Sequence, residues 1–127
     1  MESLVVVSKV KNFIKKNHEL STSSTFCEKL SLKLQDYFLA ASLEAKSSKR
    51  KTVLDRDILV ETPQEPEQDE VLVVSSKVKR FIKEKQGLST SVKVMNKASS
   101  IVRLVCNSAS LKAKEDGRKT VLERDLE

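Results

Sequence analysis

The sequence repeats itself at an interval of 68 residues, and this repeat constrains the possible folds more than any other feature. Three stretches of the first half align without a gap with three of the second: LVVVSKVKNFIKK with LVVSSKVKRFIKE, LSTS with LSTS, and RKTVLDRDI with RKTVLERDL, starting at Leu4 and Leu72, Leu20 and Leu88, and Arg50 and Arg118. Such self-similarity indicates two copies of one structural unit. We place the copies at residues 1–60 and 71–127.

Residues 61–70 between the copies read ETPQEPEQDE, with two prolines and five acidic residues. This composition is typical of a solvated linker. At about 3.3 Å per residue, ten residues span roughly 30 Å. The second copy can therefore begin on the far side of the first.

Each copy predicts a short helix, a long helix and a second short helix, which gives an all-α fold class. Apolar residues at i, i+3 and i+4 mark the first helix of each copy: Val10, Phe13 and Ile14, and Val78, Phe81 and Ile82. Ser8 and Ser76 are expected N-caps, and Gly87 is expected to end the second copy's first helix. For Leu4–Val7 both a helical and an extended conformation stay open.

A Ser/Thr cluster marks the start of each long helix, at Ser21–Ser24 and Ser89–Ser91. The helix then runs for about 25 residues, or roughly 38 Å, and Gly117 ends the second one. One face stays apolar in both copies: Phe26, Leu30, Leu34, Tyr37, Phe38, Ala41 and Ala45, and Val94, Ala98, Ile101, Val102, Val105, Ala109 and Ala113. A final helix of about two turns is expected over Val53–Leu59 and over Val121–Leu126.

One such unit encloses too little volume to form a core by itself. We therefore expect the two long helices to cross and to cover each other's apolar faces. Because the copies are fused, this pairing takes place within one chain at a high effective concentration. The expected state is a self-paired monomer, with weak higher oligomers left open.

The order of the elements and the second loop of each copy resemble histones. KRKTVLDRDI (Lys49–Ile58) and GRKTVLERDL (Gly117–Leu126) are similar to the R-K-T-[VI]-x-x-x-D-[VIL] stretch of archaeal and bacterial histones. The two-in-one arrangement resembles histone doublets, which are also called pseudodimeric histones. The resemblance implies two tandem histone folds, paired head to tail as an intramolecular handshake dimer, that bind and compact DNA in chromatin and have no enzymatic activity.

The resemblance also implies where DNA is bound. In histones the second loop of one unit lies beside the first loop of its partner, and each loop pair binds phosphate. The residues so implied are Arg50, Lys51 and Thr52 with Ser89 and Thr90 at one edge, and Arg118, Lys119 and Thr120 with Ser21 and Thr22 at the other. The family's arginine pairs with the aspartate seven residues on, so Arg50–Asp57 and Arg118–Asp125 are expected to be mainly structural salt bridges. A third zone on the first helices comprises Lys9, Lys11, Lys15, Lys16, Lys77, Lys79, Arg80 and Lys83.

The charge distribution favours the same partner. The chain has a formal net charge of +6, and because five acids lie in the linker the remainder carries +11. Such an excess attracts polyanions, nucleic acid first and anionic membrane second. The short final helices predict that one molecule bends a short site and builds no long wrapped fibre. A cytoplasmic, nucleoid-associated location follows, because no membrane span or signal peptide is evident.

Other chemistry has little support in the sequence. His18 is the one histidine and is interpreted as a loop residue, while Cys27 and Cys106 are interpreted as apolar core fillers. No metal, cofactor or catalytic set is expected. The rival function is a histone-fold module that binds other proteins and contacts DNA little. Association with anionic membranes is a weak third alternative, because no helix joins a basic face to a bulky aromatic one.

Overall fold

The computed structural model describes residues 3–60 and 71–126, and the elements of its two halves are offset by the same 68 residues. The first half contains α1 (Val7–His18), β1 (Ser21–Thr22), α2 (Ser24–Ser47), β2 (Thr52–Val53) and the 3-10 helix η1 (Asp55–Asp57). The second contains α3 (Ser75–Gln86), β3 (Ser89–Thr90), α4 (Val92–Glu115), β4 (Thr120–Val121) and the 3-10 helix η2 (Glu123–Leu126). The predicted linker, residues 61–70, lies outside the described residues.

The first helix of each half begins one residue before the serine that the sequence suggested as its cap. Val6 and Val74 occupy the N-cap positions and make no side-chain capping bond, so the assignment of Ser8 and Ser76 was wrong. The reason is a backbone contact between the copies. Val5 and Val73 form an antiparallel bridge, and the N–H groups of Val6 and Val74 donate to the carbonyls of Leu72 and Leu4, each at 2.8 Å. Residues 3–6 are therefore not helical.

Left-handed residues end the helices at matching positions. Gly87 caps α3 with φ 69°, as predicted, and Glu19 holds the same conformation after α1 with φ 57°. After the long helices the left-handed residues are Lys49 (φ 60°) and Gly117 (φ 71°). Glycine adopts this conformation without a steric cost, whereas glutamate and lysine do not.

The final helices are shorter than the two turns predicted. The 3-10 helices span three and four residues, and Val53 and Val121 belong to the strands that precede them. Hydrogen bonding explains the short turn. The carboxylate of Asp57 accepts the Leu54 N–H at 2.8 Å, and Ile58 is already extended. Asp125 accepts the Leu122 N–H in the same way.

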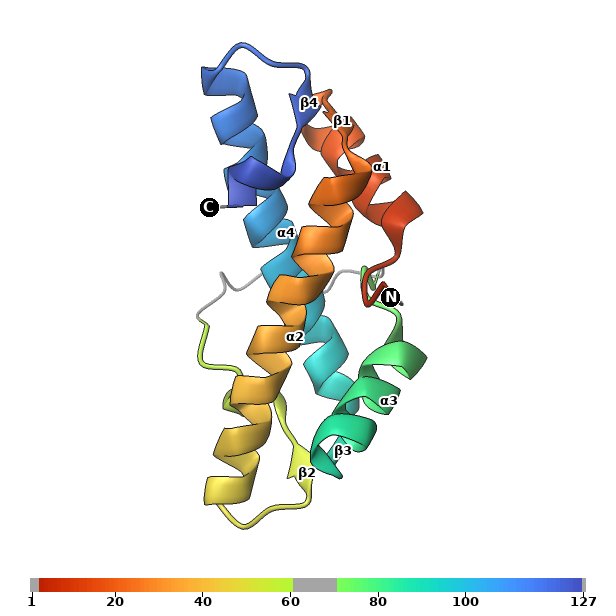
Figure 1. Cartoon of the computed structure of the whole chain (residues 1–127), viewed down its shortest axis with the longest axis vertical. Helices are drawn as coiled ribbons and strands as arrows, with labels where there is room; N and C mark the ends of the chain where they lie inside the picture. Colours follow the sequence, from red (N-terminus) through yellow and green to blue (C-terminus); the bar gives the residue numbers. More distant parts are fainter. Residues whose placement is uncertain (1–2, 61–70, 127) are drawn as a thin grey trace.

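The long helices α2 and α4 cross at the centre of the molecule, and α1 and α3 lie to one side of the pair (Figure 1). Each first helix packs on the other half's long helix: α1 contacts α4, and α3 contacts α2. The 3-10 helices η1 and η2 each contact both long helices, α2 and α4. The predicted apolar faces are buried between them, apart from Tyr37 and Val105, which are half-buried. Most of the core therefore lies between the halves.

Two buried serines explain how the N-terminal segments are held over this core. Ser31 and Ser99, which occupy equivalent positions on α2 and α4, are each 1% exposed. Their hydroxyls accept the backbone N–H groups of Leu4 at 2.9 Å and Leu72 at 3.0 Å. Because each segment's amide is satisfied in this way, its leucine can be buried without leaving an unpaired donor.

Candidate nucleic-acid interface

Two pairs of loops lie at opposite ends of the long axis (Figure 1). At one end β2 pairs in parallel with β3, with Thr52 opposite Ser89. At the other end β1 pairs in parallel with β4, with Ser21 opposite Thr120. We call these the β2/β3 end (residues 46–52 and 86–93) and the β1/β4 end (residues 114–120 and 18–25).

Backbone hydrogen bonds fix each RKT loop against a Ser/Thr loop of the other half. Ser89 and Ser91 donate to the carbonyls of Lys51 and Val53, each at 2.9 Å. At the β1/β4 end, Ser21 donates to the Lys119 carbonyl at 2.9 Å and Ser23 to the Val121 carbonyl at 3.0 Å. Each end thus joins loops from both halves.

A long helix starts at each of these ends. Ser91 caps α4 by accepting the Lys93 N–H at 3.3 Å, and Ser23 caps α2 by accepting the Phe26 N–H at 3.1 Å. The remaining N–H groups of a first helical turn carry partial positive charge. Both ends therefore combine backbone donors with nearby lysines, which is a chemistry suited to phosphate.

The candidate side chains at the ends differ in exposure. Lys51, Lys119, Ser21 and Ser89 are exposed, whereas Thr52 and Thr120 are half-buried. Thr22 and Thr90 are also half-buried, and their hydroxyl oxygens are enclosed without a hydrogen-bond partner among the described residues. Exposed amines and serine hydroxyls are thus better placed than these two threonine hydroxyls to meet a ligand.

The two arginines lie against the aspartates seven residues on. Arg50 donates two hydrogen bonds to Asp57, with Nη1 at 2.8 Å from Oδ2, and Arg118 donates two to Asp125, at 3.0 and 2.6 Å. Each arginine also donates to a backbone carbonyl of its own loop, that of Thr52 or Thr120. The aspartate side chains are 3% exposed. The arginines thus tie the RKT loops to the 3-10 helices.

These pairs shift the ionisation of both partners. Hydrogen bonds from Arg50 hold the pKa of Asp57 below its ordinary value, and those from Arg118 do the same to the pKa of Asp125. The same hydrogen bonds, which Asp57 and Asp125 accept, raise the pKa of each arginine. All four groups therefore stay charged at neutral pH.

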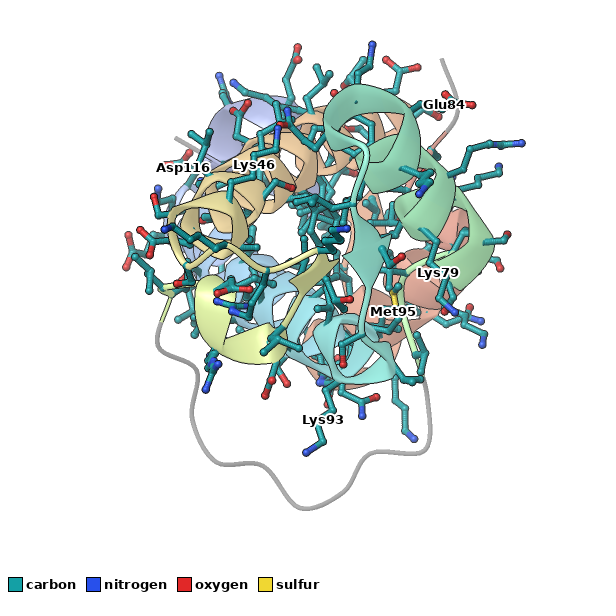
Figure 2. All side chains as sticks on the ribbon, turned by 90° about the horizontal axis from the view of Figure 1, so that it is seen from below. Lys46, Lys79, Glu84, Lys93, Met95 and Asp116 are labelled. Atoms are coloured by element: carbon teal, nitrogen blue, oxygen red, sulfur yellow. The ribbon has the colours of Figure 1, made fainter. Side chains whose placement is uncertain are left out.

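The basic residues of the first helices lie on the side of the molecule that α1 and α3 share (Figures 1 and 2). Lys11, Lys15, Lys16, Lys79, Arg80 and Lys83 are exposed, whereas Lys9 and Lys77 are half-buried. Because the segments before these helices meet at the Val5–Val73 bridge, the basic residues lie between the two ends. The fold thus provides three zones that contain basic residues.

Three basic residues at the β2/β3 end were not among the sequence-based candidates: Lys46, Lys49 and Lys93. Lys46 donates to the Gln86 side-chain oxygen at 2.7 Å, and Lys49 and Lys93 are exposed. The sequence contained the signal, because Lys49 directly precedes the RKT motif and Lys93 closely follows LSTS. Figure 2 views the molecule from this end, and Lys93 projects outward there.

The cysteines and the histidine show no sign of a reactive site. Cys27 and Cys106 are buried free thiols, and burial raises the pKa of Cys106 to about 12. Nε2 of His18 lies 2.8 Å from Oδ1 of Asn107, and the Lys114 amine lies 3.2 Å from its Nδ1. In the described part of the chain no group of three or more His, Cys, Asp or Glu side chains is arranged to hold a metal. None of the helices described is long and apolar enough to cross a membrane.

Comparison with known proteins shows a likeness of structure. No family model matches the sequence, and no curated protein matches it. Among solved structures, the histone from Methanopyrus kandleri superimposes with a TM-score of 0.69 at 18% sequence identity, over 97% of this chain and 91% of that one. The chain therefore has an all-α histone fold, as the sequence predicted.

Proposed function

We propose that this protein is a histone-like architectural protein that binds double-stranded DNA through its phosphates, without regard to sequence. The observation that carries the proposal is the pairing of each RKT loop with a Ser/Thr loop of the other half, at both ends of the molecule. Each end offers exposed lysines and a helix N-terminus, which are general phosphate ligands. A chromosome-associated location and the absence of catalysis belong to the same proposal.

We further propose that residues 1–60 and 71–127 are two histone folds that form an intramolecular handshake pair, as in a histone doublet. The identical offset of the elements supports this assignment. The packing of each first helix on the long helix of the other half, α1 on α4 and α3 on α2, also supports it. The proposed unit is one self-paired chain connected through residues 61–70.

The proposed contacts are the two ends and, between them, the first helices. Lys51, Thr52, Lys119 and Thr120 would bind phosphate at the ends, and the basic residues of α1 and α3 would bind it in the middle. If the three zones form a convex surface, a duplex reaches all of them only by bending. Bending about 20–30 base pairs by tens of degrees costs on the order of 1–6 kcal/mol, which several phosphate contacts can offset.

Binding and bending are tested separately. Two duplexes of about 25 base pairs with unrelated sequences should bind with equal affinity at low salt, because the proposed contacts are to the backbone. Affinities that differ by more than about tenfold would indicate base recognition and contradict the proposal. Ligase-mediated circularisation of short duplexes should become faster with protein. Straight, stiffened DNA at saturation would contradict the bending model but leave binding intact.

A protein-binding module is the second candidate function. Two exposed leucines at equivalent positions favour it. Leu43 on α2 is 62% exposed, and Leu111 on α4 is 55% exposed. Apolar side chains duplicated on the surface can form a contact with another protein. A protein that binds no random duplex at low salt, but in which changing both leucines to serine abolishes self-association, would favour this function.

A further inference from the structure

The two ends of the molecule share one backbone arrangement but differ strongly in charge. Residues 46–52 and 86–93 at the β2/β3 end contain no acidic side chain and five basic ones: Lys46, Lys49, Arg50, Lys51 and Lys93. Residues 114–120 and 18–25 at the β1/β4 end contain three basic side chains, Lys114, Arg118 and Lys119, and three acidic ones, Glu19, Glu115 and Asp116. The 68-residue repeat makes each position at one end directly comparable with a position at the other.

Lys49 occupies a position where the backbone disfavours it. Its φ is 60°, in the left-handed region, and the equivalent residue in the other half is Gly117. A side chain with a Cβ costs free energy in this conformation, whereas glycine does not. The Lys49 side chain is exposed, so burial in the core does not account for a lysine here. Its exposed amine is accessible to a ligand of opposite charge.

Lys93 is a second cation placed against local preference. It lies in the first turn of α4, two residues after the Ser91 cap, where the helix dipole disfavours positive charge. The equivalent residue at the start of α2 is the uncharged Thr25. Lys93 is exposed. Both unfavourably placed lysines are thus found at the same end of the molecule.

Acidic groups at the β1/β4 end offset the positive charge of its basic residues. Asp116 accepts a hydrogen bond from Arg118 at 2.9 Å, while its side chain remains 59% exposed. Glu19 and Glu115 are exposed as well. The residues equivalent to these three acids at the β2/β3 end are Gly87, Ser47 and Ser48. A phosphate approaching the β1/β4 end would therefore meet exposed carboxylates that the other end lacks.

We infer that the protein holds duplex DNA unequally: the β2/β3 end is the principal phosphate-binding end, and the β1/β4 end makes the weaker contact. This inference rests on the proposed DNA-binding function and adds a direction to it. Lys49, Lys51 and Lys93 anchor the duplex together with the lysines of α1 and α3. The duplex separates first from the β1/β4 end, so each bound molecule has a strong end and a weak end.

The repeat supplies matched variants for a test. Lys51→Ala and Lys119→Ala remove equivalent lysines from the two ends. The double variant Lys49→Gly/Lys93→Thr gives the β2/β3 end the equivalent residues of the β1/β4 end. The reciprocal variant Thr25→Lys/Asp116→Ser/Gly117→Lys gives the β1/β4 end those of the β2/β3 end. All are measured by fluorescence anisotropy on one random-sequence duplex of about 20 base pairs, with thermal melts as folding controls.

We expect Lys51→Ala to weaken binding about fivefold to tenfold at about 0.1 M salt, the effect of one lost phosphate contact, and Lys119→Ala to weaken it less than about twofold. The double variant should lose about tenfold or more in affinity. The melting temperature of the double variant should not fall, because Lys49→Gly removes the free-energy cost of a residue with a Cβ in the left-handed conformation. The reciprocal variant should bind more tightly than the wild type.

The outcomes separate this inference from the function on which it rests. Equal losses for Lys51→Ala and Lys119→Ala would overturn the inference and leave DNA binding standing. So would a double variant with wild-type affinity. A wild-type protein that binds no random duplex at low salt would overturn the proposed function, and the inference with it.

Discussion

At the scale of single residues, the arginine and the lysine of each RKT motif have different roles. Arg50 and Arg118 are held by Asp57 and Asp125, whose side chains are 3% exposed. The following lysines are exposed. One residue therefore fixes the loop, and the next is available to a ligand.

The first prediction concerns the arginines. Arg50→Ala and Arg118→Ala should lower the melting temperature, because each leaves a nearly buried carboxylate without its guanidinium partner. DNA affinity should fall by less than the fivefold to tenfold that a lost phosphate contact costs at about 0.1 M salt. Thermal melts and anisotropy titrations of both variants test this. Unchanged melting for both would show that the arginines do not clamp the loops.

The second prediction concerns acid pH. Folding lowers the pKa of Asp57 and of Asp125 below 3.8, chiefly through the arginine hydrogen bonds. The unfolded chain therefore takes up protons first, so the stabilisation is present above pH 3.8 and is lost as the pH falls through the folded-state values. Melting temperatures measured from about pH 6 to about pH 2 should decline below about pH 4. Asp57→Asn/Asp125→Asn should decline less steeply, and a slope equal to that of the wild type would be contrary to this account.

At the scale of elements, the helix ends show how the two copies differ in local strain. α1 ends at a left-handed Glu19 and α3 at a left-handed Gly87. An added Cβ at Gly87 would have nothing within 4 Å, so a side chain there would be disfavoured by the left-handed backbone and not by a steric clash with its surroundings.

The third prediction uses this matched pair. Glu19→Gly should raise the free energy of unfolding by about 1 kcal/mol, because the left-handed conformation carries a cost for residues with a Cβ. Gly87→Glu should lower it by a similar amount. Denaturant unfolding of the two variants measures both changes. If the two shifts had the same sign, backbone strain could not be their cause.

The sequence predicted the elements that depend on repeat and periodicity. The long helices and their apolar faces follow from spacing alone, and Gly87 and Gly117 mark helix ends through glycine's freedom in φ. The helix starts at Val7 and Ser75 could not be predicted, because they depend on the bridge between Val5 and Val73, which are 68 residues apart. The short 3-10 helices were missed because the Asp57 and Asp125 carboxylates close the turn through the Leu54 and Leu122 amides.

The candidate site could be predicted from the sequence only in part. The RKT and LSTS stretches identify the loops, but their pairing was implied only by the resemblance to histones. The unfavourable placement of Lys49 and Lys93 is apparent only when the left-handed backbone and the start of α4 are known. Side-chain enclosure of the Thr22 and Thr90 hydroxyls likewise depends on packing between the halves.

At the scale of the whole molecule, much of the packing joins the two halves. α1 packs on α4, α3 packs on α2, and each 3-10 helix contacts both long helices. The stability of each half should therefore depend on the presence of the other.

The fourth prediction follows from this dependence. A protein with a protease site inserted between residues 61 and 70 should be a monomer before cleavage, with a melting temperature independent of concentration. After cleavage the melting temperature should rise with protein concentration, because folding is then coupled to association. Sedimentation and melts of intact and cleaved protein test it. Halves that stay folded without associating would refute an intramolecular pair.

The central claim is that the folded chain binds duplex DNA through its phosphates, and the salt dependence of binding tests it most directly. With about six to eight phosphates neutralised at the two ends and the first helices, log K should fall with log[salt] at a slope near −5 to −7. The slope should become shallower by about 0.9 for each contact removed, as in Lys51→Ala. A slope near zero on a random duplex, or no binding at low salt, would contradict the account.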